Sequence, residues 1–163
     1  MSLTASRVVT LDRLAAALDA PRRDGSTIAL ANGLFDVLHV GHLRYLEAAA
    51  HEADFLVVAI NSDASARALK GPSRPYVEQE QRAELIAGFE CVDHVIIFDE
   101  LTVEPVLRTL RPDVHCKGTD YTEDTVPEAE VARELGIRVA IVGDPKHHAT
   151  RALIERIRSV HDV

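Results

Sequence analysis

The sequence is poor in cysteine, in long apolar runs and in positive charge, and each shortage excludes a class of protein. Its two cysteines, Cys91 and Cys116, lie far apart without the close spacing of a metal site, so we expect two free thiols. The longest apolar run, FLVVAI at 55–60, is too short to span a bilayer, and the N-terminus lacks the charged lead and apolar stretch of a secretory signal. We therefore expect a cytoplasmic protein.

Positive charge is outweighed across the chain. Lysine and arginine number 18 against 26 acidic residues, which leaves a net charge of -8. Such a surface is not built to bind nucleic acid or anionic lipid, so any phosphate that binds should sit in a local pocket. A length of 163 residues with 47% apolar residues favours one folded domain, with no room for a second catalytic domain.

Short β-branched apolar runs alternate with segments of helical spacing. Parallel neighbouring strands need right-handed crossover connections, so this alternation predicts helices on both faces of one sheet. We predict an α/β fold at residues 27–163, a Rossmann-like doubly wound five-stranded parallel sheet. The predicted strands are residues 27–31, 55–60, 94–98, 114–117 and 138–142. The predicted helices are residues 42–51, 78–89, 103–110, 127–135 and 149–160.

An additional helix is predicted before the sheet. Residues 10–20 have helical spacing behind Thr10, a favourable N-cap, and the breaker-rich stretch PRRDGS follows. We therefore expect residues 1–26 to form an N-terminal helical appendage, and a candidate contact between subunits.

The stretch NGLFDVLHVGH, residues 32–42, follows the first predicted strand. Ligands of such sheets bind beyond the carboxyl ends of the strands, and a helix beginning near Gly41 would point free N–H groups at a phosphate there. His39 and His42 could donate ring N–H bonds to phosphate oxygens and stabilise their charge. The stretch is neither the dinucleotide glycine fingerprint nor a P-loop. The plainer alternative is that His39 caps a turn and His42 only packs.

Every fixed position of G-x-F-D-x-x-H-x-G-H is present here, so the chain resembles the cytidylyltransferase-like nucleotidyltransferases. These enzymes join a nucleoside triphosphate to a phosphorylated alcohol or sugar and release pyrophosphate. Residues 58–75 and 117–121 are similar to the branch that makes ADP-heptose from heptose 1-phosphate. The resemblance covers residues 27–158 and implies a homodimer. Many such domains are fused to a sugar kinase, so we expect a separate kinase to supply the substrate.

The resemblance also implies roles for individual residues. Leu34 and Phe35 would contact the nucleotide through their backbone, beside Gly41, while His39 and His42 would hold the triphosphate and the transition state. The attacking sugar phosphate oxygen is already ionised at neutral pH, so no general base is required. Catalysis would rest on alignment and charge stabilisation.

Attack of one phosphate on another gathers negative charge, so cations must surround the site. Lys70 and Arg74 lie in LKGPSRP, whose glycine and prolines suggest a loop that could close over the substrate, and Arg82 lies in the next predicted helix. We assign Lys70 to catalysis and Arg74 and Arg82 to substrate binding. The alternative for each is a solvated surface charge.

Polar residues follow two further strands at the same edge of the predicted sheet. Asn61 and Asp63 follow the second strand and are predicted to bind sugar hydroxyls or phosphate, with Ser62 capping a short helix. Lys117 and Asp120 follow the fourth strand, and the resemblance implies that they face the ribose or phosphates of the nucleotide. A polar turn is the alternative for this second pair.

The last predicted helix opens differently from those of relatives, which carry a Ser-Thr-Thr-like triplet that binds phosphate. This chain has Ala149, Thr150 and Arg151, so the first hydroxyl is missing, while Thr150 and Arg151 would contact the nucleotide phosphates. The adjacent His147 and His148 are typical of a solvated loop. We assign no protein-bound metal and expect Mg²⁺ to arrive on the triphosphate.

Three functions remain open at this point. The first is transfer from ATP to D-glycero-D-manno-heptose 1-phosphate. The second is a cytidylyltransferase acting on glycerol 3-phosphate or another small phosphate or phosphonate. The third is a nucleotide-binding module without turnover, which the altered triplet at 149–151 allows. A fragment of a tRNA synthetase fails because the second, lysine-rich signature is missing and the chain is acidic.

Overall fold

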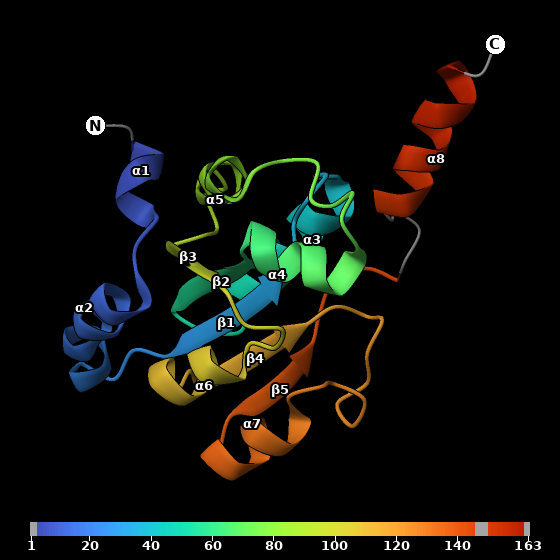
Figure 1. Ribbon diagram of the computed structural model, residues 1–163. Coiled ribbons are helices and arrows are strands. Elements are labelled where there is room, and N and C mark those ends of the chain that lie inside the picture. The colour runs from blue at the N-terminus through green and yellow to red at the C-terminus, as the bar shows by residue number, and fades with distance from the viewer. Residues whose placement is uncertain (1–2, 146–149, 162–163) are drawn as a thin grey trace.

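The computed structural model describes residues 3–145 and 150–161 and has a five-stranded parallel sheet at its centre (Figure 1). The strand order is β3-β2-β1-β4-β5, so successive strands run outward from β1 in both directions. This confirms the predicted doubly wound sheet and puts the switch point between β1 and β4, where such folds bind ligands. The strands are β1 (Ile28–Gly33), β2 (Phe55–Asn61), β3 (His94–Phe98), β4 (Val114–Lys117) and β5 (Arg138–Ile141).

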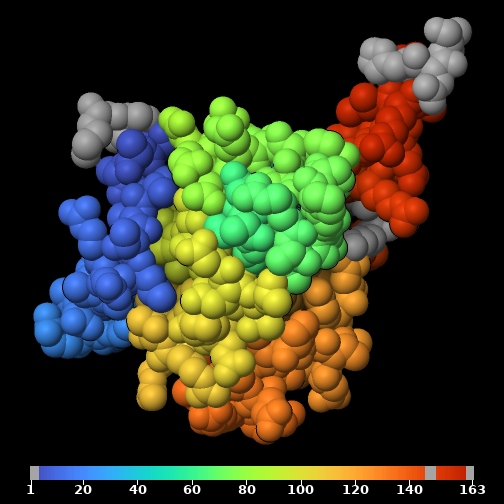
Figure 2. All heavy atoms as spheres, viewed as in Figure 1, coloured from blue at the N-terminus to red at the C-terminus, as the bar shows by residue number. Residues whose placement is uncertain are grey.

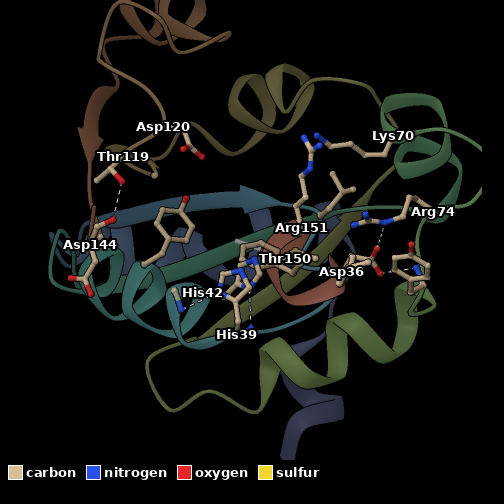
Figure 3. Close-up of a pocket in the computed structure, with 18 of the residues that line it drawn as sticks. Asp36, His39, His42, Lys70, Arg74, Thr119, Asp120, Asp144, Thr150 and Arg151 are labelled. Atoms are coloured by element: carbon tan, nitrogen blue, oxygen red, sulfur yellow. Dashed lines mark hydrogen bonds and ion pairs between the residues drawn. The ribbon is translucent and has the colours of Figure 1, made fainter. Parts of the chain in front are cut away.

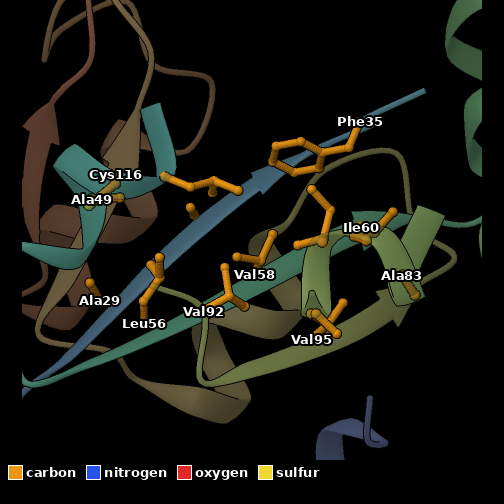
Figure 4. Packing of buried hydrophobic residues seen from close by; sticks show 14 of the residues in the cluster. Ala29, Phe35, Ala49, Leu56, Val58, Ile60, Ala83, Val92, Val95 and Cys116 are labelled. Carbon is orange, nitrogen blue, oxygen red and sulfur yellow. The ribbon is translucent and has the colours of Figure 1, made fainter. Parts of the chain in front are cut away.

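Helices cover both faces of this sheet, as the alternating pattern predicted. On one face, Leu46 and Ala49 of α3 and Ile86 of α5 pack on the apolar side chains of the strands (Figure 4). On the other face, α2, α6 and α7 pack over a second buried cluster. The helices are α1 (Leu3–Arg7), α2 (Leu11–Arg23), α3 (Val40–Ala50), α4 (Asp63–Lys70), α5 (Gln79–Ala87), α6 (Glu104–Leu110), α7 (Ala129–Leu135) and α8 (Thr150–His161).

The helices of the N-terminal segment, α1 and α2, pack against the rest of the domain, so in the described residues this segment does not stand apart from the sheet and its helices. Thr10 caps α2 as predicted, with its hydroxyl accepting a bond from the backbone N–H of Arg13. Leu14 and Leu18 are completely or almost completely buried in the cluster that α6 and α7 share. An amphipathic helix has one apolar face, and α2 packs that face against the cluster inside the chain.

The state of the two cysteines and the character of the helices bear on the expectations from composition. Cys91 is half-buried, Cys116 is buried in β4, and both are free. Burial raises the pKa of the Cys116 thiol to about 12. Within residues 3–145 and 150–161, no helix has the length and apolar character needed to cross a bilayer.

The C-terminal helix α8 extends from the body of the molecule (Figures 1 and 2). Two of its apolar residues are exposed, Ile157 by 50% and Val160 by 66%. The start of the helix contacts the rest of the domain, where Thr150 Oγ1 donates to the carbonyl of Val37 at 3.2 Å. The N-terminal end of α8 therefore sits at the carboxyl edge of the sheet, close to the site described next.

Candidate active site

Two adjoining hollows open at the carboxyl ends of β1, β2 and β4. The larger has a volume of about 760 Å³ and runs from the start of α3 to the start of α8 (Figure 3). The smaller, of about 530 Å³, lies over the ends of β1 and β4, between Asn61 and Glu128. Both volumes are in the range of small-molecule sites. The residues that line both hollows are Leu34, Phe35, His42, Tyr45, Lys70, Gly118 and Asp120.

The turn after β1 shapes the wall that the two hollows share. Phe35 is buried, and its backbone adopts the left-handed conformation with φ of 50°. The centroid of its ring lies 5.4 Å from that of His42. A Cβ on Gly33 would lie 3.1 Å from Phe35 Cε2, so any larger residue at this position would require the ring to shift. This tight turn positions the backbone of Leu34 and Phe35 on the cleft wall.

The histidine pair is fixed by the first turn of α3. The backbone N–H of Gly41 donates to His39 Nδ1 at 3.1 Å, and the backbone N–H of His39 donates to His42 Nδ1 at 3.3 Å. Because Nδ1 is an acceptor in both rings, the neutral tautomer carries its proton on Nε2. Burial, followed by the nearby charge of His39, lowers the pKa of His42 to about 4. At neutral pH His42 is therefore a neutral Nε2–H donor.

The capping role and the phosphate-binding role predicted for the histidines are compatible. His39 does cap the helix, as the plainer alternative proposed, and both rings also line the larger hollow beside Gly41. Capping uses the Nδ1 edge of each ring. The Nε2 edges are the ones suited to a ligand, because they carry the proton.

Asp36 organises the loop after α4 and was not given a role from the sequence. Its buried carboxylate accepts bonds from Arg74 Nε at 2.6 Å and from the backbone N–H groups of Tyr76 at 2.7 Å and Val77 at 3.0 Å. The Arg74 guanidinium also lies 4.8 Å from the centre of the Tyr76 ring. The signal that could have identified Asp36 is its place in the family signature, where the aspartate is a fixed position.

The predicted cations Lys70 and Arg74 both reach the cleft. Lys70 is the last residue of α4, before the loop, and lines both hollows, whereas Arg74 lines the larger one (Figure 3). The carboxylate of Asp36 offsets the charge of Arg74, while Lys70 is exposed at the junction of the hollows. Lys70 is thus the cation best placed to meet two ligands at once.

Arg82 does not face the cleft, which corrects its assignment to substrate binding. Its side chain is fully buried, and its Nη1 donates to the carbonyls of Leu34 at 2.6 Å and Asn61 at 2.8 Å. Its Nε donates to the carbonyl of Val77 and its Nη2 to Asp63 Oδ1, at 2.9 and 2.7 Å. Arg82 therefore ties together the ends of β1 and β2 and the loop before α5. Burial of an arginine is tolerable only with such complete pairing.

Asn61 and Asp63, predicted as a pair, lie in different places. Asn61 is buried on the wall of the smaller hollow, where its Nδ2 donates to Ser65 Oγ at 2.9 Å. Asp63 accepts its bond from Arg82 and is not among the described residues that line the two hollows, so its assignment to substrate binding stays a prediction. Ser62 caps α4 as predicted, accepting from the N–H of Ser65.

A buried polar cluster lies under the smaller hollow and was only partly foreseen. Lys117 lines this hollow, and its Nζ donates to Asn32 Oδ1 at 3.3 Å and lies 3.8 Å from Glu128 Oε2. Burial lowers the pKa of Lys117, while Glu128 opposes that shift. The fully buried His115 donates from Nε2 to the same Asn32 oxygen at 3.0 Å. Asn32 and His115 lie in β1 and β4 and Glu128 precedes α7, and the sequence carried no further signal for a role of these three residues.

The far wall of the larger hollow comes from the loops after β4 and β5. Asp120 lines both hollows, and Thr119 Oγ1 donates to the carbonyl of Asp144 at 2.9 Å. Gly143 has φ of 93°, and a Cβ there would lie 3.2 Å from the Cα of Tyr45, so this close approach requires glycine.

The start of α8 completes the larger hollow. Thr150 and Arg151 both line it, as the resemblance implied, although Arg151 is highly exposed and pairs with Glu155 at 3.0 Å. Lys146, His147, His148 and Ala149 lie outside the described residues, so the altered first position of the triplet is not covered. In the described ranges there is no group of three or more His, Cys, Asp or Glu side chains placed to hold a metal ion.

Comparisons with known proteins identify similar sequences. The chain is 43% identical over 152 residues to the bifunctional protein HldE of Syntrophotalea carbinolica and 44% identical over 152 residues to that of Geobacter sulfurreducens. Each alignment covers 93% of this chain but only 31% of the relative, so the chain spans about a third of these proteins.

A solved structure and a family profile also match. The crystal structure of the lipopolysaccharide core biosynthesis protein from Thermoplasma volcanium GSS1 superposes with a TM-score of 0.64 at 26% identity, covering 75% of this chain and all of that one. The profile of the cytidylyltransferase-like family matches residues 30–160, a range that contains all the described residues lining the two hollows. The chain belongs to the cytidylyltransferase-like family.

Proposed function

We propose that this protein is a nucleotidyltransferase that transfers the nucleoside monophosphate of ATP to D-glycero-D-manno-heptose 1-phosphate and releases pyrophosphate. The observation that carries the proposal is the pair of adjoining hollows whose common wall contains His42 and Lys70. A transfer between two phosphates needs two ligand sites that meet at cationic and N–H donor groups. Membership of the cytidylyltransferase-like family supports the same reaction class.

The larger hollow suits the nucleoside triphosphate. His39 and His42 offer Nε2–H donors at the start of α3, where the helix dipole favours an anion. Arg74 and Arg151 also line this hollow and add positive charge to it. Mg²⁺ is part of this substrate in our proposal, because Mg²⁺ binds chiefly through phosphate oxygens and retains most of its waters.

The smaller hollow suits the acceptor. It lies at the switch point of the sheet and holds Lys117 on one side and Lys70 at its junction with the larger hollow. A sugar phosphate bound here would direct its phosphate toward the junction and its hydroxyls toward Asn61 and Glu128. The similarity of residues 58–75 and 117–121 to ADP-heptose-forming enzymes supports a heptose 1-phosphate as this acceptor.

The residues at the junction suggest how transfer proceeds. An oxygen of the acceptor phosphate attacks the α-phosphorus of the nucleotide, and the bond from that phosphorus to the oxygen bridging to the β-phosphate breaks as pyrophosphate leaves. His42, neutral and protonated on Nε2, donates to the oxygens that gain charge and cannot accept a proton through the same atom. Lys70 offsets the charge of the two converging phosphates. The acceptor is already ionised, so no base is needed.

The acceptor must be made by a phosphorylating enzyme. The similar proteins of known sequence are named bifunctional and are about three times as long as the part this chain matches. By the resemblance to domains fused with sugar kinases, we propose that a sugar kinase supplies the heptose 1-phosphate. We also propose a homodimer, which light scattering of the purified chain would test.

A matrix of substrates tests the proposal. Pyrophosphate release should be measured with ATP, GTP, CTP and UTP, each with heptose 1-phosphate and with glycerol 3-phosphate, in the presence of Mg²⁺. We expect release with ATP and heptose 1-phosphate. Turnover only with CTP and glycerol 3-phosphate would favour the cytidylyltransferase alternative. Nucleotide binding without any pyrophosphate would favour the module without turnover.

A further inference from the structure

We infer that Glu128 selects the acceptor by accepting a hydrogen bond from one of its hydroxyl groups, which makes the smaller hollow specific for a polyhydroxylated phosphate ester. This inference rests on the proposed function and identifies what distinguishes one acceptor from another. It concerns a residue at the N-cap of α7, which the family signature does not include.

The evidence begins with an incomplete hydrogen-bond shell. Glu128 is only 5% exposed and lines the smaller hollow. Its Oε1 accepts one long bond, 3.4 Å, from the backbone N–H of Val103. Its Oε2 is buried and has no hydrogen-bond partner among the described residues. A buried carboxylate can accept about four hydrogen bonds, and leaving an oxygen without any is costly.

Lys117 does not complete this shell. Its Nζ lies 3.8 Å from Glu128 Oε2, beyond hydrogen-bond distance, and donates instead to Asn32 Oδ1 at 3.3 Å. It also lies over the Tyr121 ring, 4.9 Å from the centroid. Lys117 thus faces the carboxylate at the distance of an ion pair but leaves Oε2 with capacity for another donor.

The chemistry of the missing partner follows from the charge. A carboxylate accepts hydrogen bonds and repels phosphate, so the group that meets Glu128 is a hydroxyl of the acceptor and not its phosphate. The phosphate is then expected to lie toward Lys70, which also lines this hollow. Sites with a buried polar group that pairs with a substrate hydroxyl discriminate strongly against analogues without it. Glycerol 3-phosphate, with a shorter body, would leave Glu128 unpaired.

The variant Glu128→Gln tests this inference, with Glu130→Gln as a matched control on the exposed side of the same helix. We expect the KM for heptose 1-phosphate to rise at least about tenfold in Glu128→Gln, because a charge-assisted bond is lost, with the KM for ATP unchanged within a factor of two. Glu130→Gln should match the parent. If Glu128→Gln fails to fold, as judged by its melting temperature, Glu128→Asp retains the charge but withdraws it from the hollow and should raise the same KM.

The outcomes separate this inference from the proposed function. If the parent releases no pyrophosphate with any pair of substrates, the proposed function fails and this inference with it. If the parent uses heptose 1-phosphate but a folded Glu128 variant keeps the parent's acceptor KM, only the inference is overturned. A fall in kcat or a rise in the KM for ATP without a change in acceptor KM would also overturn it, because Glu128 would then act outside the acceptor site.

Discussion

The imidazole rings of His39 and His42 lie 3.9 Å apart, centroid to centroid, with 32° between their planes, and each accepts a backbone N–H at Nδ1. The first turn of α3 thereby determines which nitrogen of each ring carries the proton. Two N–H donors are oriented by the same backbone turn that opens the helix toward the cleft. In the proposed reaction this arrangement needs no reorganisation as charge develops on the phosphate.

Replacing His42 by alanine is therefore expected to lower kcat by about 10²- to 10³-fold, the usual cost of removing one preorganised donor. The fold should persist, because the ring is only partly buried. His51→Ala, at the exposed C-terminal end of the same helix, is the control and should retain the parent's rate. Steady-state pyrophosphate release measures both. A His42→Ala enzyme with parental kcat would show that His42 is a packing residue.

Asp36→Asn tests the attachment of the loop after α4. Loss of the charge weakens the bonds to Arg74, Tyr76 and Val77 and leaves the Arg74 guanidinium without its partner, at a cost of about 2 kcal/mol in the free energy of unfolding. Urea titration measures this cost. Glu52→Gln, which breaks the more exposed pair with Arg138, should change stability by less than about 1 kcal/mol. Equal effects of the two variants would contradict the special position of Asp36.

Arg82→Lys distinguishes a structural arginine from a substrate-binding one. Lysine cannot reproduce the forked bonds to Leu34, Asn61 and Asp63, so we expect a loss of about 3 kcal/mol in the free energy of unfolding. Arg74→Lys, on the wall of the larger hollow, should affect stability less and the KM for ATP more. Chemical denaturation together with ATP kinetics separates the two. A stable Arg82→Lys protein with a raised substrate KM would restore the original assignment.

The buried His115 predicts a specific dependence of stability on pH. Burial, followed by the charge of Lys117, lowers its pKa to about 3, whereas the unfolded chain should titrate near 6.5. Between these values the unfolded state binds a proton that the folded state does not, so stability is complete above pH 6.5 and falls as the pH drops toward 3. One such group contributes a slope of up to about 1.4 kcal/mol per pH unit.

His115→Gln should reduce that slope by about one proton, because glutamine does not titrate but can still donate to Asn32 Oδ1. Urea unfolding at pH 7, 6, 5 and 4 measures the slope for the parent and the variant. His51→Gln, at an exposed position, should leave the slope unchanged. An unchanged slope in His115→Gln would mean that the buried ring does not control the acid response.

The sheet and its helices were predictable because their signal is local. Each strand is a short β-branched run, so all five were located to within two residues at either end. The packing of α2 was not predictable in the same way. Its apolar positions Leu14 and Leu18 indicate that one face must be buried, but not whether the sheet or another subunit buries it.

In the site too, sequence patterns identified some residues, whereas others could be identified only from the fold. The histidines could be located from the family signature, and Lys70 and Arg74 from the glycine- and proline-containing stretch LKGPSRP, and all four line the larger hollow. Arg82 was assigned to the cleft because the sequence does not show whether a cationic side chain on a helix points toward solvent or into the protein interior. Glu128 is distant in sequence from every motif, and only the fold brings it to within 3.8 Å of Lys117.

The most direct test of the account is the structure of the product, followed by ³¹P nuclear magnetic resonance in a mixture of protein, ATP, Mg²⁺ and heptose 1-phosphate. We predict that the monoester resonance of the sugar phosphate is replaced by two coupled resonances of a phosphoanhydride, with one pyrophosphate released for each sugar consumed. Pyrophosphate or phosphate formed while the sugar phosphate resonance persists would contradict nucleotidyl transfer to this acceptor.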